Sequence, residues 1–188
     1  MAHNNHLKTA PSTNKITFLI CVFTFLTFAS IHAQSVNIEW QQIYGGTNAD
    51  GAYDIDATAD GGFITGGYSY SGISGNKSVT NYGDSDYWVV KTDAAGNIEW
   101  QKTYGGSAFE QVETIAQTAD GGYIVGGYSV SGISGNKTEA NVAGSIDLWI
   151  VKLDASGNIT WQNAIGGNGS DYLGSIYPTS DGGYIVGA

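Results

Sequence analysis

Apolar and polar residues alternate over short runs along most of the chain beyond residue 34. In the run 98–104, Ile98, Trp100 and Tyr104 fall on one side of an extended chain, and polar residues such as Glu99 fall on the other. This two-residue period predicts β-strands. The runs are separated by Gly-rich segments, and none of them shows the 3.6-residue period of an amphipathic helix. The pattern therefore predicts an all-β chain.

Four predicted strands follow one another in each unit of the pattern. In the first full unit they cover residues 52–58, 63–70, 86–92 and 98–104. The sequence Asp60-Gly61-Gly62 predicts a tight turn between the first two strands, because glycine accepts a positive φ. A longer polar loop covers residues 71–84, and a second tight turn covers 93–97. The third strand, 86–92, is apolar on both faces, so we expect both of its faces to be covered.

The whole unit recurs after about sixty residues. Trp40, Trp100 and Trp161 occupy equivalent places, at spacings of 60 and 61 residues. A repeated four-stranded antiparallel meander with both faces covered is typical of the blades of a β-propeller. We therefore predict blades at 52–105 and 112–167, a half blade at 172–188 and a lone fourth strand at 36–44. Propellers close with about 4–8 blades, so we expect the chain to be the N-terminal fragment of a longer protein, or an open stack that must pair with something else.

The repeated aromatic and acidic side chains have structural interpretations. We expect the Trp and Tyr residues to pack between blades; the alternative is a row of exposed rings that stack on sugars. The repeated acids are expected to cap turns. They are Asp60, Asp120 and Asp181 before the Gly pairs, and Asp93 and Asp154 in the second type of turn.

Residues 1–33 have the order of a secretory signal peptide. A polar start with Lys8 and Lys15 is followed by an uncharged apolar run, 16–29, and by Ala33 before Gln34. We expect cleavage after Ala33 and export from the cell. A membrane anchor is the alternative, but the apolar run has about 14 residues where a membrane span needs about 20.

Removal of this segment changes the chemistry available to the chain. All three His, the only Cys and the only Met lie within it, and the sequence contains no Arg. This composition excludes a His-based triad, a Cys nucleophile and a His or Cys zinc site from residues 34–188. Five of the 7 lysines then face 17 acidic residues, a net charge of −12. Such a surface argues against nucleic acid and anionic membranes as partners.

At the level of whole units, the chain resembles a known repeat type. The motifs DGGYI, SGISGNK and WIVKLDASGN occur in order within residues 36–188. They are similar to the ~60-residue repeats of secreted, often very large proteins of Bacteroidota. The resemblance implies export by type IX secretion and a place at the cell surface or outside the cell. The resemblance assigns no catalytic residues to this chain, because most members of that group have no assigned activity.

Candidate chemistry is sparse. Glu110, Glu113 and Asp171 have no obvious counterparts in the other units, but the sequence offers them no partner, so no catalytic and no cofactor-binding residue is predicted. The loops 76–86 and 136–147 are rich in oxygen ligands of the kind that calcium prefers. Asp84, Asp86 and Asp147 are the candidate ligands, with a simply solvated loop as the alternative.

These observations favour an exported, non-enzymatic repeat protein that acts as a binding or adhesion scaffold. The expected partner is an extracellular polysaccharide or a surface protein. Two alternatives remain: a propeller module attached to an extracellular polysaccharide-degrading enzyme, whose catalytic part lies beyond Ala188, and a structural spacer.

Overall fold

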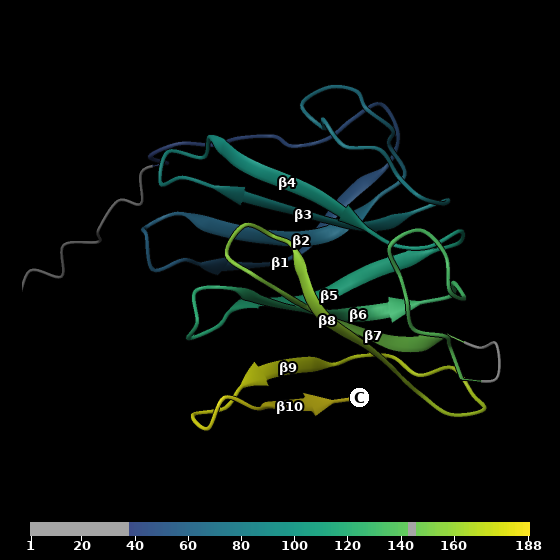
Figure 1. Ribbon diagram of the computed structural model, residues 1–188. Coiled ribbons are helices and arrows are strands. Elements are labelled where there is room, and N and C mark those ends of the chain that lie inside the picture. Colours follow the sequence, from purple (N-terminus) through teal and green to yellow (C-terminus); the bar gives the residue numbers. More distant parts are fainter. Residues whose placement is uncertain (1–37, 143–145) are drawn as a thin grey trace, which may run out of the picture. The chain divides into compact units, whose positions relative to one another are not determined.

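The computed structural model describes residues 38–142 and 146–188 (Figure 1). The chain divides into two units, Met1–Glu39 and Trp40–Ala188, and every strand of the described residues lies in the second. The predicted signal peptide, 1–33, lies outside the described residues. No helix in the described part of the chain is long and apolar enough to cross a membrane.

In the described part of the chain, ten strands form three antiparallel sheets, which lie one on another in the order of the sequence (Figure 1). The first sheet contains β1 (Asp50–Ala57), β2 (Phe63–Ser69), β3 (Asp86–Thr92) and β4 (Ile98–Tyr104). The second contains β5 (Glu110–Gln117), β6 (Tyr123–Ser129), β7 (Asp147–Leu153) and β8 (Ile159–Ile165). The third is the pair β9 (Ser175–Pro178) and β10 (Tyr184–Gly187). The described residues contain no helix, so the all-β prediction with four-stranded antiparallel sheets is confirmed.

The predicted strand bounds agree well with the structure inside each sheet. β3 and β4 have the predicted bounds, whereas β1 begins two residues earlier than expected, at Asp50. The two complete sheets share one register: Phe63 is opposite Thr92 in the first, and Tyr123 is opposite Leu153 in the second. The repeat seen in the sequence is therefore a repeat of strand pairing.

The lone strand predicted at 36–44 is not formed over its described part, 38–44. A β-strand needs a hydrogen-bonded neighbour, and none of the described strands pairs with this segment. Its side chains nevertheless pack on the first sheet. The Trp40 ring contacts the Phe63 ring, with centroids 5.8 Å apart, and the Tyr44 hydroxyl donates to the carbonyl of Gly96 at 2.6 Å.

The core lies between the stacked sheets. All seven residues of β3 and all seven of β7 are buried, as their apolar character on both faces predicts. Tyr87 of β3 and Trp149 of β7 meet at the centre, with ring centroids 4.9 Å apart, and the Tyr87 hydroxyl donates to the Trp149 carbonyl at 2.9 Å. A second cluster, formed by Ile124, Ile150 and Ile176, joins the second sheet to the third.

One aromatic contact recurs at each step of the stack. Trp40 packs on Phe63, Trp100 on Tyr123 and Trp161 on Tyr184, with centroid separations of 5.8, 5.8 and 5.7 Å. The interplanar angle is 63° in all three pairs. These Trp side chains therefore pack between successive units, as expected, although Trp40 and Trp161 stay partly exposed.

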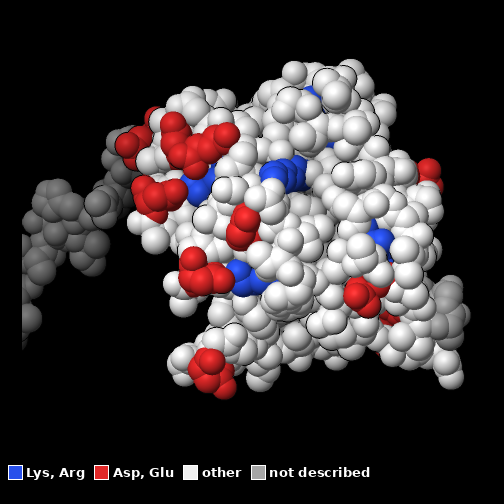
Figure 2. All heavy atoms as spheres, in the orientation of Figure 1, with Lys and Arg blue, Asp and Glu red and all other residues white. Residues whose placement is uncertain are grey.

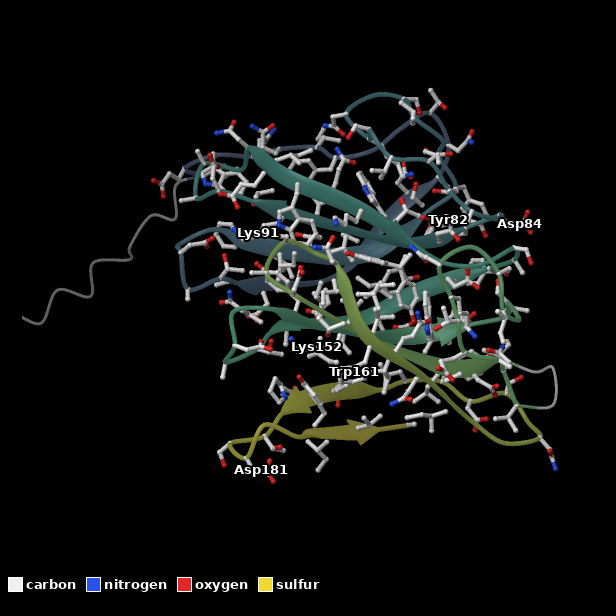
Figure 3. All side chains as sticks on the ribbon, viewed as in Figure 1. Tyr82, Asp84, Lys91, Lys152, Trp161 and Asp181 are labelled. Carbon is white, nitrogen blue, oxygen red and sulfur yellow. The ribbon has the colours of Figure 1, made fainter. Side chains whose placement is uncertain are left out.

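The acid before each Gly pair caps its turn. Asp60 accepts hydrogen bonds from the Thr58 hydroxyl and the Gly62 amide, and Asp120 and Asp181 repeat both contacts. In the two complete sheets a buried lysine also reaches this acid: Lys91 lies 2.9 Å from Asp60, and Lys152 lies 2.9 Å from Asp120 (Figure 3). Figure 2 shows acidic side chains gathered along the edge of the molecule that carries these turns.

Candidate functional site: a groove between the first two sheets

The SGISGNK motif is a clip that joins each sheet to the segment before it. In the second unit, Asn136 accepts from the Gly105 amide at 2.9 Å and donates to the Thr103 carbonyl at 3.1 Å. Ser134 and Ser131 accept from the next amides, Ser107 and Ala108. Asn76 makes the same contacts in the first unit, with Gly45 and Ile43. The clip fixes the end of β4 against the loop of the following sheet.

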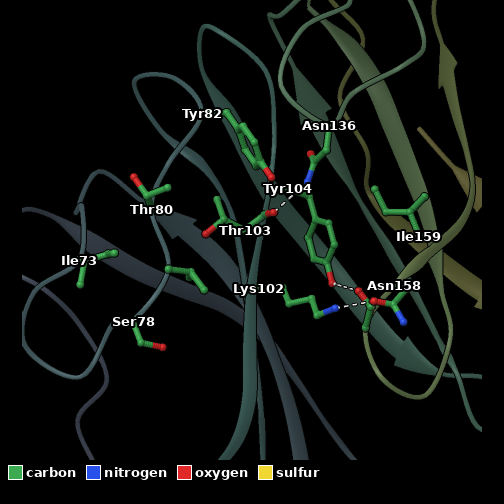
Figure 4. A pocket seen from close by; sticks show the side chains of 12 residues that line it. Ile73, Ser78, Thr80, Tyr82, Lys102, Thr103, Tyr104, Asn136, Asn158 and Ile159 are labelled. Atoms are coloured by element: carbon green, nitrogen blue, oxygen red, sulfur yellow. Dashed lines mark hydrogen bonds between the residues drawn. The ribbon is translucent and has the colours of Figure 1, made fainter.

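Beside this clip lies a groove of about 630 Å³ (Figure 4). The loop after β2 forms one wall, the end of β4 forms the floor, and Asn136 and the β7–β8 turn form the other wall. The lining residues are Ile73, Ser78, Val79, Thr80, Tyr82, Lys102, Thr103, Tyr104, Asn136, Gly157, Asn158 and Ile159. Residues from two successive units thus meet in one hollow.

Two hydrogen bonds fix the floor of the groove to its far wall. The Lys102 ammonium donates to the Asn158 side-chain oxygen at 2.6 Å, and the Tyr104 hydroxyl donates to the Gly157 carbonyl at 2.6 Å (Figure 4). Burial raises the pKa of Tyr104 well above its usual range, so this hydroxyl keeps its proton. These two bonds therefore hold the floor in one arrangement.

Tyr82 supplies an aromatic surface at the rim. Its side chain is 50% exposed, and its base lies against the backbone of Gly135 in the loop of the second unit. The main-chain amide of Tyr82 donates to Asp86 at 2.5 Å, which anchors the loop that carries the ring. None of the residues that line the groove is acidic, in contrast to the edge with the tight turns.

The groove is also a place where the two units differ. Tyr82 corresponds to Val142 in the second unit, and Lys102 corresponds to Asn163. The neighbouring clip residues Asn76 and Asn136 are the same in both. The two units thus share the clip residues but differ in side chains that line the groove. Among the described residues, a tyrosine and a lysine at these two places occur together only in the first unit.

A second unusual feature is a buried pair of acids beneath the loop, Asp86 and Glu110. Both side chains are 0% exposed. Glu110 accepts from the Gly106 amide at 2.8 Å and the Ser129 hydroxyl at 2.7 Å, whereas Asp86 Oδ1 has no hydrogen-bond partner. Burial, with the nearby Glu110 as a further cause, raises the pKa of Asp86 to about 7.

The structure corrects the interpretation of Glu110 and Asp171 as residues without counterparts. Asp50, Glu110 and Asp171 occupy the same place in successive units, and each accepts the amide of the glycine four residues earlier, at 2.7, 2.8 and 2.7 Å. The exchange of Asp for Glu hid this repeat in the sequence. Glu113 does not share the place; it accepts from Gln111 at 2.8 Å.

The three calcium candidates do not form one site. Asp84 is exposed in the loop, whereas Asp86 and Asp147 are buried at the starts of β3 and β7, in different sheets. Among residues 38–142 and 146–188, no group of three or more His, Cys, Asp or Glu side chains is arranged to hold a metal ion. Calcium binding therefore stays a prediction, without a built site in this part of the chain.

The chain matches no protein-family model and no curated protein. The groove must therefore be interpreted from its own geometry. Sequence reasoning missed it because the groove combines a loop, a strand end and a turn of the following unit. The available signal was the difference between units at Tyr82 and Lys102, within an otherwise constant pattern.

Proposed function

We propose that this chain belongs to an exported, non-enzymatic β-propeller protein that binds an extracellular polysaccharide. In this proposal each sheet is a blade. Four-stranded antiparallel meanders that stack face to face, with one repeated Trp–aromatic contact at each step, are what propeller blades require. The apolar run and Ala33 at the N-terminus support export, and the type IX route rests on the resemblance to Bacteroidota repeats.

The observation that carries the binding proposal is the position of Tyr82 and Lys102. In a repeat protein the constant residues maintain the stack, so a ligand site is expected where units differ. Tyr82 offers a ring face for a sugar, and the amide, hydroxyl and ammonium groups of the groove offer hydrogen bonds. The absence of acids from the lining suits a neutral polymer with many hydroxyl groups.

The test is a glycan array followed by titration of the neutral polymers that bind. Tyr82→Ala is expected to weaken binding at least tenfold, because loss of an aromatic ring that stacks on the ligand typically costs over 1 kcal/mol. Tyr53→Ala is the matched control, since Tyr53 lies on β1 of the same unit, is 51% exposed and is outside the groove. Equal affinities of the two variants, or no binding to any polymer, would contradict the proposal; the second result would favour the spacer alternative.

A further inference from the structure

A row of aromatic rings crosses the junction of the two complete sheets. Tyr70 follows β2, and its ring centroid lies 6.1 Å from that of Phe109, which precedes β5. Phe109 in turn stacks on Tyr128 of β6, with centroids 5.8 Å apart and an interplanar angle of 28°. Tyr68 continues the row beyond Tyr70 at 5.8 Å, and Tyr172 continues it beyond Tyr128 at 5.3 Å.

A carboxylate lies beside the stacked pair of rings. Gln111 of β5 is directly opposite Tyr128 of β6, so their side chains lie on the same face of the second sheet. The Glu113 carboxylate accepts a hydrogen bond from the Gln111 side-chain amide at 2.8 Å. Burial, with Glu113 as a further cause, raises the pKa of Tyr128 to about 12. Tyr70 is exposed, and Phe109, Glu113 and Tyr128 are half-buried, so a ligand can reach all four.

No positive side chain of the described residues pairs with this carboxylate. The three ion pairs within residues 38–142 and 146–188 do not include Glu113. Four of the five lysines after residue 34 are buried, and the fifth, Lys102, donates to Asn158 at 2.6 Å. The sequence contains no Arg. This part of the surface is thus acidic and aromatic, and its electrostatic complement is a cation.

The combination of three rings and a carboxylate is specific to one junction. Tyr70 corresponds to Val130 in the second unit, and Phe109 corresponds to Ala49 in the first. Glu113 corresponds to a tyrosine in the first unit and to a glycine in the third. The stack therefore forms without these side chains at the other places, and a ligand site is expected where units differ.

We infer that Tyr70, Phe109, Glu113 and Tyr128 bind the guanidinium group of an arginine side chain on a partner protein. A guanidinium is planar and weakly hydrated, stacks on aromatic faces and presents parallel N–H groups to a carboxylate. The Glu113 carboxylate has acceptor sites beyond the one that Gln111 uses. Because residues 1–188 contain no arginine, a second copy of them cannot supply the group. The rings on either side offer contact area to the residues beside the arginine.

An NMR titration of the isotope-labelled chain with N-acetyl-arginine amide, at fixed ionic strength, tests this inference. We expect saturable shifts of the amide signals of residues 109–113 and 128. N-acetyl-citrulline amide is the matched neutral ligand and should bind at least about fivefold more weakly, since it has no charge to place against the rings and the carboxylate. N-acetyl-lysine amide should also bind more weakly, because its ammonium is strongly hydrated and forms no bidentate pair.

Free arginine distinguishes the source of the group. It brings a carboxylate of its own to an acidic surface, so we expect it to bind more weakly than the blocked form. Tighter binding of the free amino acid would overturn the assignment to a protein side chain.

Three variants test the residues of the site. Tyr70→Val and Phe109→Ala insert the residues that other units carry at these places, so we expect both to fold and to weaken arginine binding about two- to fivefold. Glu113→Gln should weaken arginine binding about fivefold but leave citrulline binding unchanged, a difference that a purely structural effect would not produce. Glu139→Gln is the control, an exposed acid in the loop after β6 of the same unit.

Equal binding of the arginine and citrulline ligands, or shifts confined to residues outside the site, would overturn the inference. An equal loss in Glu113→Gln and Glu139→Gln would also overturn it, since binding would then follow the net charge of the chain. These outcomes leave the proposed polysaccharide groove untouched, because the two sites share no residue.

Discussion

Single residues in this protein are informative where the units differ and where polar groups are buried. The exchange of Glu110 for Asp50 and Asp171 leaves the capping contact unchanged but places a longer side chain beside Asp86. The carboxyl groups of Asp86 and Glu110 are both fully buried. Asp86 Oδ1 receives no hydrogen bond from the protein. Burial, with the nearby Glu110 carboxyl as a further cause, therefore raises the pKa of Asp86.

This pair predicts a pH-dependent stability. Folding raises the pKa of Asp86 from 3.8 to about 7, so between these values the folded chain holds a proton that the unfolded chain releases. The free energy of unfolding therefore falls as the pH rises from about 4 to about 7, and this contribution is constant above that range. Asp86→Asn keeps a neutral donor at this place and should flatten the dependence.

At pH 8 we expect Asp86→Asn to be more stable than the wild type by about 1–4 kcal/mol, because raising the pKa from 3.8 to about 7 corresponds to about 4 kcal/mol at most. Urea unfolding at pH 5 and pH 8 measures both effects. Asp84→Asn, an exposed change two residues away, is the control. A variant that is less stable than the wild type at both pH values would contradict a raised pKa of Asp86.

At the scale of the elements, tight turns and their glycines decide how the sheets fit. Gly121 and Gly157 both have positive φ, 80° and 75°. An added Cβ at Gly121 meets nothing within 4 Å, whereas at Gly157 it comes 2.9 Å from the Trp100 ring. One glycine is thus needed for backbone conformation alone, and the other for conformation and for contact between sheets.

Alanine substitutions should separate these two roles. Gly121→Ala is expected to destabilise the chain by about 1 kcal/mol, the cost of a non-glycine residue in the left-handed region. Gly157→Ala carries the same cost and also displaces Trp100, so we expect a further loss of about 1–2 kcal/mol from overpacking. Urea unfolding curves of the two variants give the difference directly. Equal losses would show that the Trp100 contact adapts freely.

A strand could be predicted from the sequence where its own residues and the adjacent turns define its bounds. The apolar run 86–92, the tight turn 93–97 and the two-residue alternation of 98–104 gave β3 and β4 their bounds, because these signals lie in the strands themselves. The segment 38–44 has the same alternation but forms no strand, since pairing depends on a neighbour that no local pattern reveals. The groove escaped prediction for the same reason: Tyr82, Lys102 and Asn158 meet only through the stacking of two units.

For the molecule as a whole, charge is the dominant surface property. The residues after the predicted cleavage site carry 5 lysines against 17 acids, and the described residues contain three ion pairs, which involve only Lys91 and Lys152. Most of the acids therefore repel one another, with many of them along the turn edge (Figure 2). This repulsion acts over about 10 Å at moderate ionic strength and is screened by salt.

Added salt should consequently stabilise the protein. We expect the Tm to rise between about 0.01 and 0.15 M NaCl, over which the screening length falls from about 30 to about 8 Å. A thermal melt followed by circular dichroism measures the change, and choline chloride at equal ionic strength is the control for sodium binding. A Tm that falls with salt would mean that the exposed Asp–Lys pairs outweigh the general repulsion.

The clip formed by the SGISGNK motif gives the stack a direction. Asn76 and Asn136 bind backbone groups that precede their own sheet in the sequence, at Gly45 and Gly105. A unit can therefore fasten to its predecessor once its first two strands and the clip have formed. Each addition closes on residues that come earlier in the sequence. The stack can thus grow in one direction, from the first unit to the last.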